Sequence, residues 1–202
     1  MSAHYVLVNL PQGTPEWREW RHGGIGASEA STVLGENPFK SADQLFQEKR
    51  GPVPNFVANA AMELGTKLEP VARERYIYRT GKNVQPACLQ SLHHPWLRAS
   101  LDGLGARGDS VVEIKCGRSA YQRTAKTGRV PSYYYAQIQH ILAITHLPSM
   151  DFWAYWPRCP EILIEVPRND NYIDQLIRLE GEFWTEVQNR CSILRIMRST
   201  LP

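Results

Sequence analysis

The sequence has no apolar run long enough to cross a membrane. Its longest apolar stretches, FWAYW at 152–156 and ILAI at 141–144, are far shorter than the ~20 residues that a transmembrane helix needs. The first residues also lack the basic segment followed by an apolar one that is typical of a secretory signal. We therefore expect neither membrane insertion nor export.

The cysteines show no pattern of a shared site. They have no CxxC pair and no histidine at ligand spacing, and they are Cys88, Cys116, Cys159 and Cys191. Neither a disulfide framework nor a structural zinc site is indicated. The expected compartment is a reducing cytoplasm.

The chain also has little net charge. Its formal charge of +3 and pI near 8.7 are too weak to indicate nucleic-acid binding by themselves. The distribution of charge is more informative, because no acidic residue occurs from 114 to 150. The basic and aromatic side chains there are Lys115, Arg118, Arg123, Lys126, Arg129, Tyr121, Tyr133, Tyr134 and Tyr135. This segment predicts a basic, aromatic surface.

There is no internal repeat, low-complexity tract or long linker, and 43% of the 202 residues are hydrophobic. We expect residues 1–202 to form a single domain. Apolar periodicity and turn residues predict helices at 16–23, 28–34, 41–51, 57–80, 119–127, 132–146 and from 169 or 170 onward, and strands at 84–92, 97–101, 110–116, 150–156 and 161–166. This order predicts a mixed α/β (α+β) fold in which helices flank a central mixed β-sheet.

Local signals refine the helices. Ser28 is a candidate N-cap, and Ser41 with Gln44 resembles a capping box. Pro70 removes an amide donor, so we expect a kink or a restart of the helix there. The three runs from 84 to 116 suggest an antiparallel meander.

The run SVVEIKC carries the chemistry. Side chains alternate across a strand, so Glu113 and Lys115 share one face. The other face is apolar and packs inward, and it consists of Val112, Ile114 and Cys116. Asp102 on the preceding strand can reach the same place if the GLGARGD segment is a tight return. Two carboxylates there suit a hard divalent cation, with Mg²⁺ as the natural candidate. A neighbouring lysine can position or deprotonate water and offset charge during phosphodiester hydrolysis.

A plainer interpretation is a surface hairpin. Glu113 and Lys115 would then form an exposed pair worth ~0.5 kcal/mol, and an Asp-Gly sequence is usually only a turn. The combination of these features with an acidic helix upstream and a basic, aromatic helix downstream is more specific than any one of them.

Five ordered segments between 16 and 166 resemble the phage lambda-type exonucleases, also called the YqaJ-like viral recombinase nucleases, of the PD-(D/E)xK superfamily. The segments are WREWRHGGIGASEAS (17–31), GTKLEPVARERY (65–76), RASLDG (98–103), VEIKC (112–116) and YYAQIQHILAIT (134–145).

The resemblance implies a role for each matching position. Metal ligands would be Asp102, Glu113, the main-chain carbonyl of Ile114, and Glu69. Lys115 would be the catalytic lysine, and Gln137 would touch the scissile phosphate or the water. A pocket for the 5′-terminal phosphate would be formed by Arg21, Ser28 and Ser100, whose guanidinium and hydroxyl donors suit a phosphate dianion. The plainer interpretations are an N-cap for Ser28, a strand hydroxyl for Ser100 and solvated helix positions for Arg21 and Gln137.

The sequence departs from the family pattern twice. Leu101 stands where a proline is usual, and Tyr121 occupies the position of a phosphate-contacting arginine. Arg118 and Arg123 are therefore DNA-contact candidates. Histidines show no metal spacing, and we expect His140 to be packed or solvent-facing and Cys116 to lie in the core.

The function implied is a Mg²⁺-dependent 5′-to-3′ exonuclease, with Mn²⁺ as a substitute and two ions per site. It would act on linear double-stranded DNA ends, release 5′-mononucleotides and leave 3′ single strands for recombination by single-strand annealing. The resemblance also implies a homotrimeric ring, a single-strand annealing protein as partner, and the cytoplasm of a bacterial or phage-infected cell. The alternatives are a PD-(D/E)xK endonuclease and a non-catalytic DNA-end-binding module. Apolar residues after Cys191 are candidates for the subunit contact.

Overall fold

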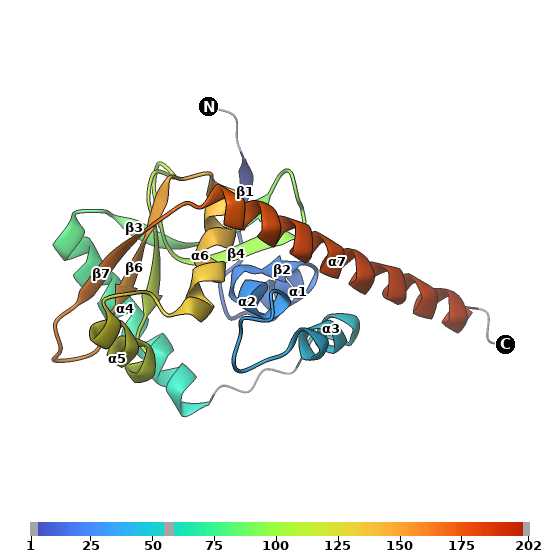
Figure 1. The fold of residues 1–202 in the computed structure, drawn as a ribbon, viewed down its shortest axis with the longest axis horizontal. Coiled ribbons are helices and arrows are strands. Elements are labelled where there is room, and N and C mark those ends of the chain that lie inside the picture. Colours follow the sequence, from blue (N-terminus) through green and yellow to red (C-terminus); the bar gives the residue numbers. More distant parts are fainter. Residues whose placement is uncertain (1–3, 55–58, 200–202) are drawn as a thin grey trace.

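The computed structural model describes residues 4–54 and 59–199, with the side chains of the last helix described as far as Asn189. Within these residues, seven strands form one sheet with the order β1-β3-β4-β5-β6-β7, and β2 pairs with β4 (Figure 1). The strands are β1 (Tyr5–Val8), β2 (Ile25–Gly26), β3 (Val84–Ser91), β4 (Leu97–Gly105), β5 (Val111–Lys115), β6 (Ser149–Ala154) and β7 (Ile162–Pro167). The sheet is mixed, because β5 pairs with β6 and β2 with β4 in parallel while the other pairs are antiparallel. The predicted meander β3-β4-β5 and the predicted fold class are confirmed.

Helices cover both faces of this sheet. They are α1 (Pro15–His22), the 3₁₀ turn η1 (Ala27–Glu29), α2 (Ala30–Val33), α3 (Ala42–Arg50), α4 (Ala60–Thr80), α5 (Arg118–Thr127), α6 (Ser132–Thr145) and α7 (Asp170–Ser199). α5 and α6 form the crossover that a parallel β5–β6 pair requires. Figure 1 shows α7 running away from the sheet toward the C-terminus. None of the described helices is long and apolar enough to cross a bilayer.

Two cores lie on opposite faces of the sheet. On one face, Ala72 and Tyr76 of α4 pack with Val112 and Ile114 of β5 and with Cys116 just after it, as predicted for Cys116. The other face packs against α6, and its core includes Leu101, Val111, Ile138, Ile141 and Phe152. The face of β5 that carries Glu113 is therefore buried too, and Glu113 is only 1% exposed. The interpretation of Glu113 and Lys115 as an exposed surface pair is wrong.

The caps explain where most helices begin and end. Ser41 and Gln44 form the predicted capping box of α3, and Asn169 accepts a hydrogen bond of 3.1 Å from the Tyr172 amide at the start of α7. Gly81 ends α4 in the left-handed conformation, with φ of 71°.

One local prediction was wrong. Ser28 is not an N-cap: it lies inside η1, whose N-cap is Gly26, and its hydroxyl accepts a hydrogen bond from Arg21. Of the kink or restart expected at Pro70, the restart does not occur, because α4 continues through Pro70 and its second half packs on the sheet through Ala72 and Tyr76. The start of this helix was predicted at 57, which lies outside the described residues, as do the side chains of Cys191 and the apolar residues after it. The three cysteines Cys88, Cys116 and Cys159 are free.

Candidate active site

Between β4 and β5, the side chain of Asp102 replaces a backbone carbonyl as a hydrogen-bond acceptor. The ladder of paired residues between these strands ends at the pair Gly103↔Val112. One step further, Oδ2 of Asp102 accepts a hydrogen bond of 2.7 Å from the amide of Ile114. The two strands are thus joined at this point through a carboxylate rather than a carbonyl. This fixes Asp102 beside Glu113, as the sequence predicted, although Asp102 lies within β4 rather than at its end.

Glu113 has one occupied and one unpartnered oxygen. Its Oε1 accepts a hydrogen bond of 2.7 Å from Nε2 of Gln137 on α6 and also contacts the Lys115 ammonium. Its Oε2 is buried and has no hydrogen-bond partner among the described residues. A buried carboxylate oxygen without a partner is costly unless something else binds it.

Glu69 reaches the site from α4 and is bound there by Arg73. Arg73 contacts the Glu69 carboxylate and donates a second hydrogen bond of 2.7 Å from Nε to the carbonyl of Asp102. Burial, followed by the neighbouring Glu113, raises the pKa of Glu69 even though Arg73 opposes the shift. Glu69 is therefore held close enough to sense the charge of the other carboxylates.

The carboxylates shift the pKa values of their neighbours. Burial, followed by the charges of Glu113 and Glu69, raises the pKa of Asp102 well above its usual range. Burial alone would lower the pKa of Lys115, but Glu113 and Asp102 outweigh it and raise the pKa instead. Lys115 is consequently an ammonium ion, also held 4.6 Å from the centre of the Tyr134 ring, and its charge partly neutralises the acidic cluster.

The side chains expected to bind a terminal phosphate form a second group, which hydrogen bonds and Trp17 hold together. Arg21 on α1 donates a hydrogen bond of 2.7 Å to Oγ of Ser28, and its guanidinium lies 4.8 Å from the Trp17 ring centre. The Trp17 indole in turn donates a hydrogen bond of 2.8 Å to Oγ of Ser100. Because both serine oxygens accept, their own O–H protons remain available to donate to an anion.

One cleft joins these two groups. Its volume is about 760 Å³, and its lining includes Trp17, Arg21, Glu69, Pro70 and Arg73. Ser100 and Asp102 lie two residues apart on the same face of β4, in which buried and half-buried positions alternate from Leu97 to Asp102. The structure thus places Arg21 and Glu69 in one cleft, and Trp17 and Arg73 of its lining bind Ser100 and Asp102.

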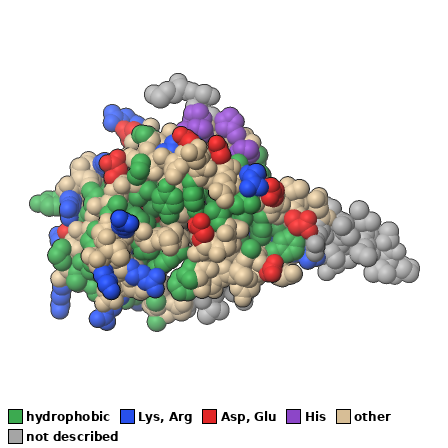
Figure 2. Space-filling view, in the orientation of Figure 1, with side chains coloured by type: hydrophobic (Ala, Val, Ile, Leu, Met, Phe, Trp, Pro, Cys, Tyr) green, Lys and Arg blue, Asp and Glu red, His purple; other side chains and the backbone are tan. Residues whose placement is uncertain are grey.

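The two DNA-contact candidates lie beside this site on α5. Arg118 is the first residue of α5, and the Arg123 guanidinium lies 5.8 Å from the Tyr133 ring centre. Both are exposed, and basic side chains gather on this part of the surface, at the lower left of Figure 2. Tyr121, in contrast, is buried and donates a hydrogen bond of 2.8 Å to the Pro160 carbonyl. A core position explains why Tyr121 cannot replace a phosphate-contacting arginine.

The sequence interpretation did not include Arg73 in the site, and it offered Trp17, together with Trp20, only as a residue that could flank the DNA entry. Both are four residues from a predicted site residue on the same helix, Trp17 before Arg21 and Arg73 after Glu69, and this spacing places their side chains together. The spacing was therefore the available signal. Their contacts with β4 depend on tertiary packing, which the spacing does not show.

The family model of the YqaJ-like viral recombinase domain matches residues 16–148. The chain belongs to the YqaJ-like viral recombinase family. The uncharacterized protein YqaJ of Bacillus subtilis (strain 168) is 28% identical over 195 residues, which cover 91% of this chain and 59% of that protein. The chain thus spans less than two thirds of the length of this family relative.

Solved structures of an alkaline exonuclease, LHK-Exo from Laribacter hongkongensis, have the same fold. One has a TM-score of 0.82 with 29% sequence identity and covers 94% of this chain and 100% of that one. LHK-Exo in complex with dAMP has a TM-score of 0.81 with 30% identity and the same coverage. The predicted family is confirmed, and family and fold together support a nuclease of the exonuclease type.

Proposed function

We propose that this protein is a metal-dependent 5′-to-3′ exonuclease that acts on the ends of linear double-stranded DNA. The observation that carries the proposal is the shared cleft, which joins Arg21 to Glu69. Donors suited to a terminal phosphate and carboxylates suited to hydrolysis then act on neighbouring linkages of one strand.

The spacing on β4 supports release of mononucleotides. Ser100 and Asp102 are two residues apart, which corresponds to about 7 Å along a strand. Successive phosphates in a nucleic-acid chain are separated by a similar distance. A 5′ phosphate held at Ser100 would therefore place the next linkage beside Asp102. LHK-Exo itself has been crystallised with a deoxynucleoside monophosphate, dAMP, which agrees with a product of one nucleotide.

The acidic residues fit a divalent cation such as Mg²⁺, or Mn²⁺ as its substitute. Oε2 of Glu113 is buried without a partner, and oxygen ligands are those that Mg²⁺ prefers. Asp102, Glu113, Glu69 and the carbonyl of Ile114 would hold two such ions, which would supply Lewis acidity and a nucleophile at neutral pH. As they stand, no three His, Cys, Asp or Glu side chains among the described residues form a ready metal site. The Lys115 and Arg73 side chains contact the carboxylates of Glu113 and Glu69. Binding of a metal ion therefore requires these two side chains to shift.

The remaining side chains have defined tasks in this proposal. Lys115 places a positive charge where the phosphate gains negative charge during hydrolysis. Gln137 fixes the orientation of Glu113 through its 2.7 Å hydrogen bond. Arg21, Ser28 and Ser100 hold the strand end, and Arg118 and Arg123 contact the backbone of the DNA.

Digestion of end-labelled linear duplex, with and without a 5′ phosphate and Mg²⁺, tests the reaction, its polarity and its metal. We expect labelled 5′-mononucleotides only with the metal, released fastest from phosphorylated ends, and 3′ single strands as the second product. Cleavage of closed circular DNA would instead indicate an endonuclease. DNA-end binding without nucleotide release in Mg²⁺ or Mn²⁺ would indicate a binding module.

The assembly and cellular context belong to the same proposal. A homotrimeric ring would let modest positive surfaces from three subunits converge on one DNA. The 3′ single strand would pass to an annealing protein during recombination, in the cytoplasm of a bacterial or phage-infected cell. Light scattering under active conditions tests the ring, and a monomer there would contradict it.

A further inference from the structure

Phe39 is an exposed aromatic side chain on a well-anchored loop. It is 76% exposed, in the segment between α2 and α3. The side chain of Asn37 holds this segment, because Oδ1 accepts a hydrogen bond of 2.9 Å from the Phe39 amide and Nδ2 donates one of 2.8 Å to Thr32. Tyr172 adds a hydrogen bond of 2.9 Å to Glu36. The loop thus presents a large apolar ring to solvent in a fixed position.

Aromatic contacts connect this ring to the candidate active site. Phe39 meets Tyr133 edge to face, with ring centres 5.8 Å apart and planes at 82°. Tyr133 contacts Tyr134 at 4.4 Å, and the Lys115 ammonium lies 4.6 Å from the Tyr134 ring centre. Phe39, Tyr133 and Tyr134 are called the aromatic strip below. The strip runs from solvent to Lys115.

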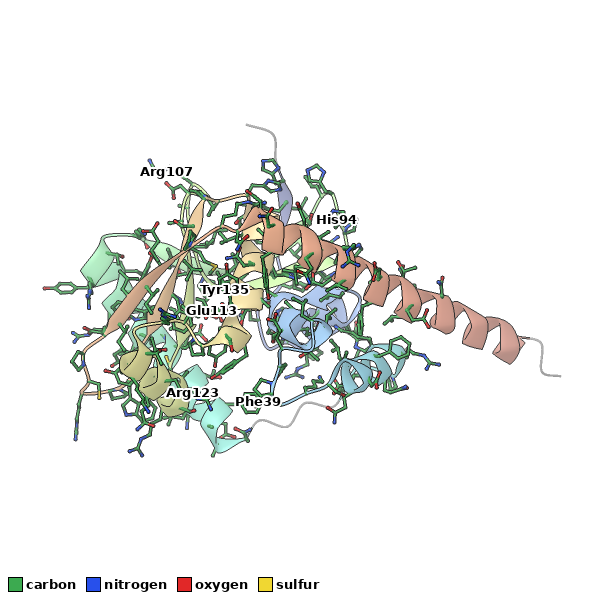
Figure 3. The ribbon with its side chains drawn as sticks, in the orientation of Figure 1. Phe39, His94, Arg107, Glu113, Arg123 and Tyr135 are labelled. Atoms are coloured by element: carbon green, nitrogen blue, oxygen red, sulfur yellow. The ribbon has the colours of Figure 1, made fainter. Side chains whose placement is uncertain are left out.

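The Tyr133 and Tyr134 end of the strip has basic neighbours. Arg123 lies 5.8 Å from the Tyr133 ring centre, and in Figure 3 it lies on the same side of the molecule as Phe39. No acidic residue occurs from 114 to 150. Phe39 also lines a shallow hollow of about 560 Å³, together with Lys40, Gln44, Gln47 and Glu48, in which Lys40 and Glu48 form an ion pair. Space and an exposed ring therefore lie at the Phe39 end of the strip, and positive charge lies beside Tyr133.

We propose that the aromatic strip binds the unpaired bases of a single DNA strand, with Arg123 on its phosphates. Aromatic side chains beside a positive groove bind single strands of any sequence, because every base has a face that can stack. The inference rests on the proposed function, and it gives the strip a reason to be next to the site. Glu113 is only 1% exposed, so it lies below the surface, where a single strand fits more easily than a duplex.

Binding without hydrolysis tests the proposal. Fluorescence anisotropy in EDTA compares a labelled twelve-nucleotide thymidine strand with an abasic strand of the same length, which keeps the phosphates and lacks the bases. Phe39→Ala should weaken binding of the thymidine strand about tenfold and leave the abasic strand within about twofold. Phe39→Trp should retain thymidine binding. Arg123→Ala should weaken both strands.

Tyr78 supplies a matched control, since it is an aromatic side chain, 88% exposed, on α4 and outside the strip. Tyr78→Ala should change neither affinity. The proposal is overturned if Phe39→Ala leaves the thymidine affinity unchanged, as it would be if the strip met a protein partner. It is also overturned if the variant weakens both strands equally, because the ring would then act through the loop. These outcomes are independent of the proposed nuclease activity, which fails separately if the unaltered protein releases no nucleotides in Mg²⁺.

Discussion

Gln137 donates a hydrogen bond of 2.7 Å to Oε1 of Glu113 across the space between α6 and β5. Both side chains are buried, so this bond fixes which Glu113 oxygen faces the helix and which faces away. The oxygen that faces away is the one without a partner.

Replacing Gln137 by Ala should slow hydrolysis more than it weakens DNA binding. Because Glu113 would lose the bond that orients it, we expect kcat to fall about 10–100-fold with KM for linear duplex changed less than about twofold. Steady-state nucleotide release measures both constants. Gln85→Ala alters an exposed glutamine on β3 and serves as the control. A rise in KM alone would assign Gln137 to DNA binding.

Asp102→Asn should abolish hydrolysis and preserve the fold. Asparagine can still accept the hydrogen bond from Ile114, while the carboxyl group beside Glu113 and Glu69 disappears. We expect activity to fall about 10²-fold or more, with a Tm equal to or above that of the unaltered protein. Mg²⁺ should raise the Tm of the unaltered protein, since a ligand that binds the folded state stabilises it.

The same metal should raise the Tm of Asp102→Asn much less. Thermal unfolding in EDTA and in Mg²⁺ gives this readout without any activity assay. Asp109→Asn, at an exposed position paired with Arg107, should respond to Mg²⁺ as the unaltered protein does. An equal response of Asp102→Asn would remove Asp102 from the metal site.

Trp17→Phe should reduce the preference for phosphorylated ends. Phenylalanine keeps a ring beside Arg21 but removes the indole N–H that orients Ser100. We expect the ratio of kcat/KM for phosphate over hydroxyl ends to fall about 3–10-fold, consistent with losing one hydrogen bond. Trp20→Phe is the matched control, because that indole donates to Gln90 at 3.1 Å instead.

Double variants separate positioning from general damage. The effects of Trp17→Phe and Ser100→Ala should not add, because they remove the same interaction, whereas Trp17→Phe and Arg21→Ala should be closer to additive. Additive effects of the first pair would show that Trp17 does not act through Ser100.

The buried pair of Glu180 and His140 predicts a dependence of stability on pH. Glu180 Oε1 lies 2.9 Å from His140 Nδ1, both side chains are fully buried, and burial raises the pKa of Glu180 despite the opposing effect of His140. A raised folded-state pKa means that the contribution of Glu180 is fully present below its unfolded pKa of about 4.3 and is lost as pH rises through the folded pKa. Glu180→Gln removes this titration.

Urea unfolding at several pH values measures the effect. The unaltered protein should lose stability relative to Glu180→Gln as pH rises above about 4.3. Glu182→Gln is the control on the same helix, since its pair with Arg178 is 61% exposed on both sides, and its difference from the unaltered protein should stay within about 0.5 kcal/mol. A constant difference for Glu180→Gln would contradict the shift.

Much of the fold could be predicted from local sequence. The predictions that failed did so because of tertiary contacts. The capping box at Ser41 and the glycine at Gly81 mark helix ends through their own backbone chemistry. The helix does not restart at Pro70 because packing of α4 on the sheet outweighs one lost hydrogen bond. Ser28 misled the prediction because its hydroxyl is bound to Arg21 rather than to the helix start.

The site was predictable where the chemistry lies within one strand pair. Alternation along β5 and the return from β4 place Asp102, Glu113 and Lys115 together, as the hydrogen bond from Ile114 to Asp102 shows. The burial of Glu113 was not predictable, because α6 covers the face of β5 that carries the charged residues Glu113 and Lys115, and the sequence alone does not show this packing. The assignment of these residues to metal, phosphate and DNA stays a prediction.

Ser100 and Asp102 are separated by a single pleat of β4. If Ser100 binds the strand end and Asp102 directs the cut, the backbone spacing of β4 sets the number of nucleotides released in each cut. A point substitution could abolish end binding or cleavage, but none could lengthen the released product. A longer product would require added residues within β4, which pairs with β2, β3 and β5.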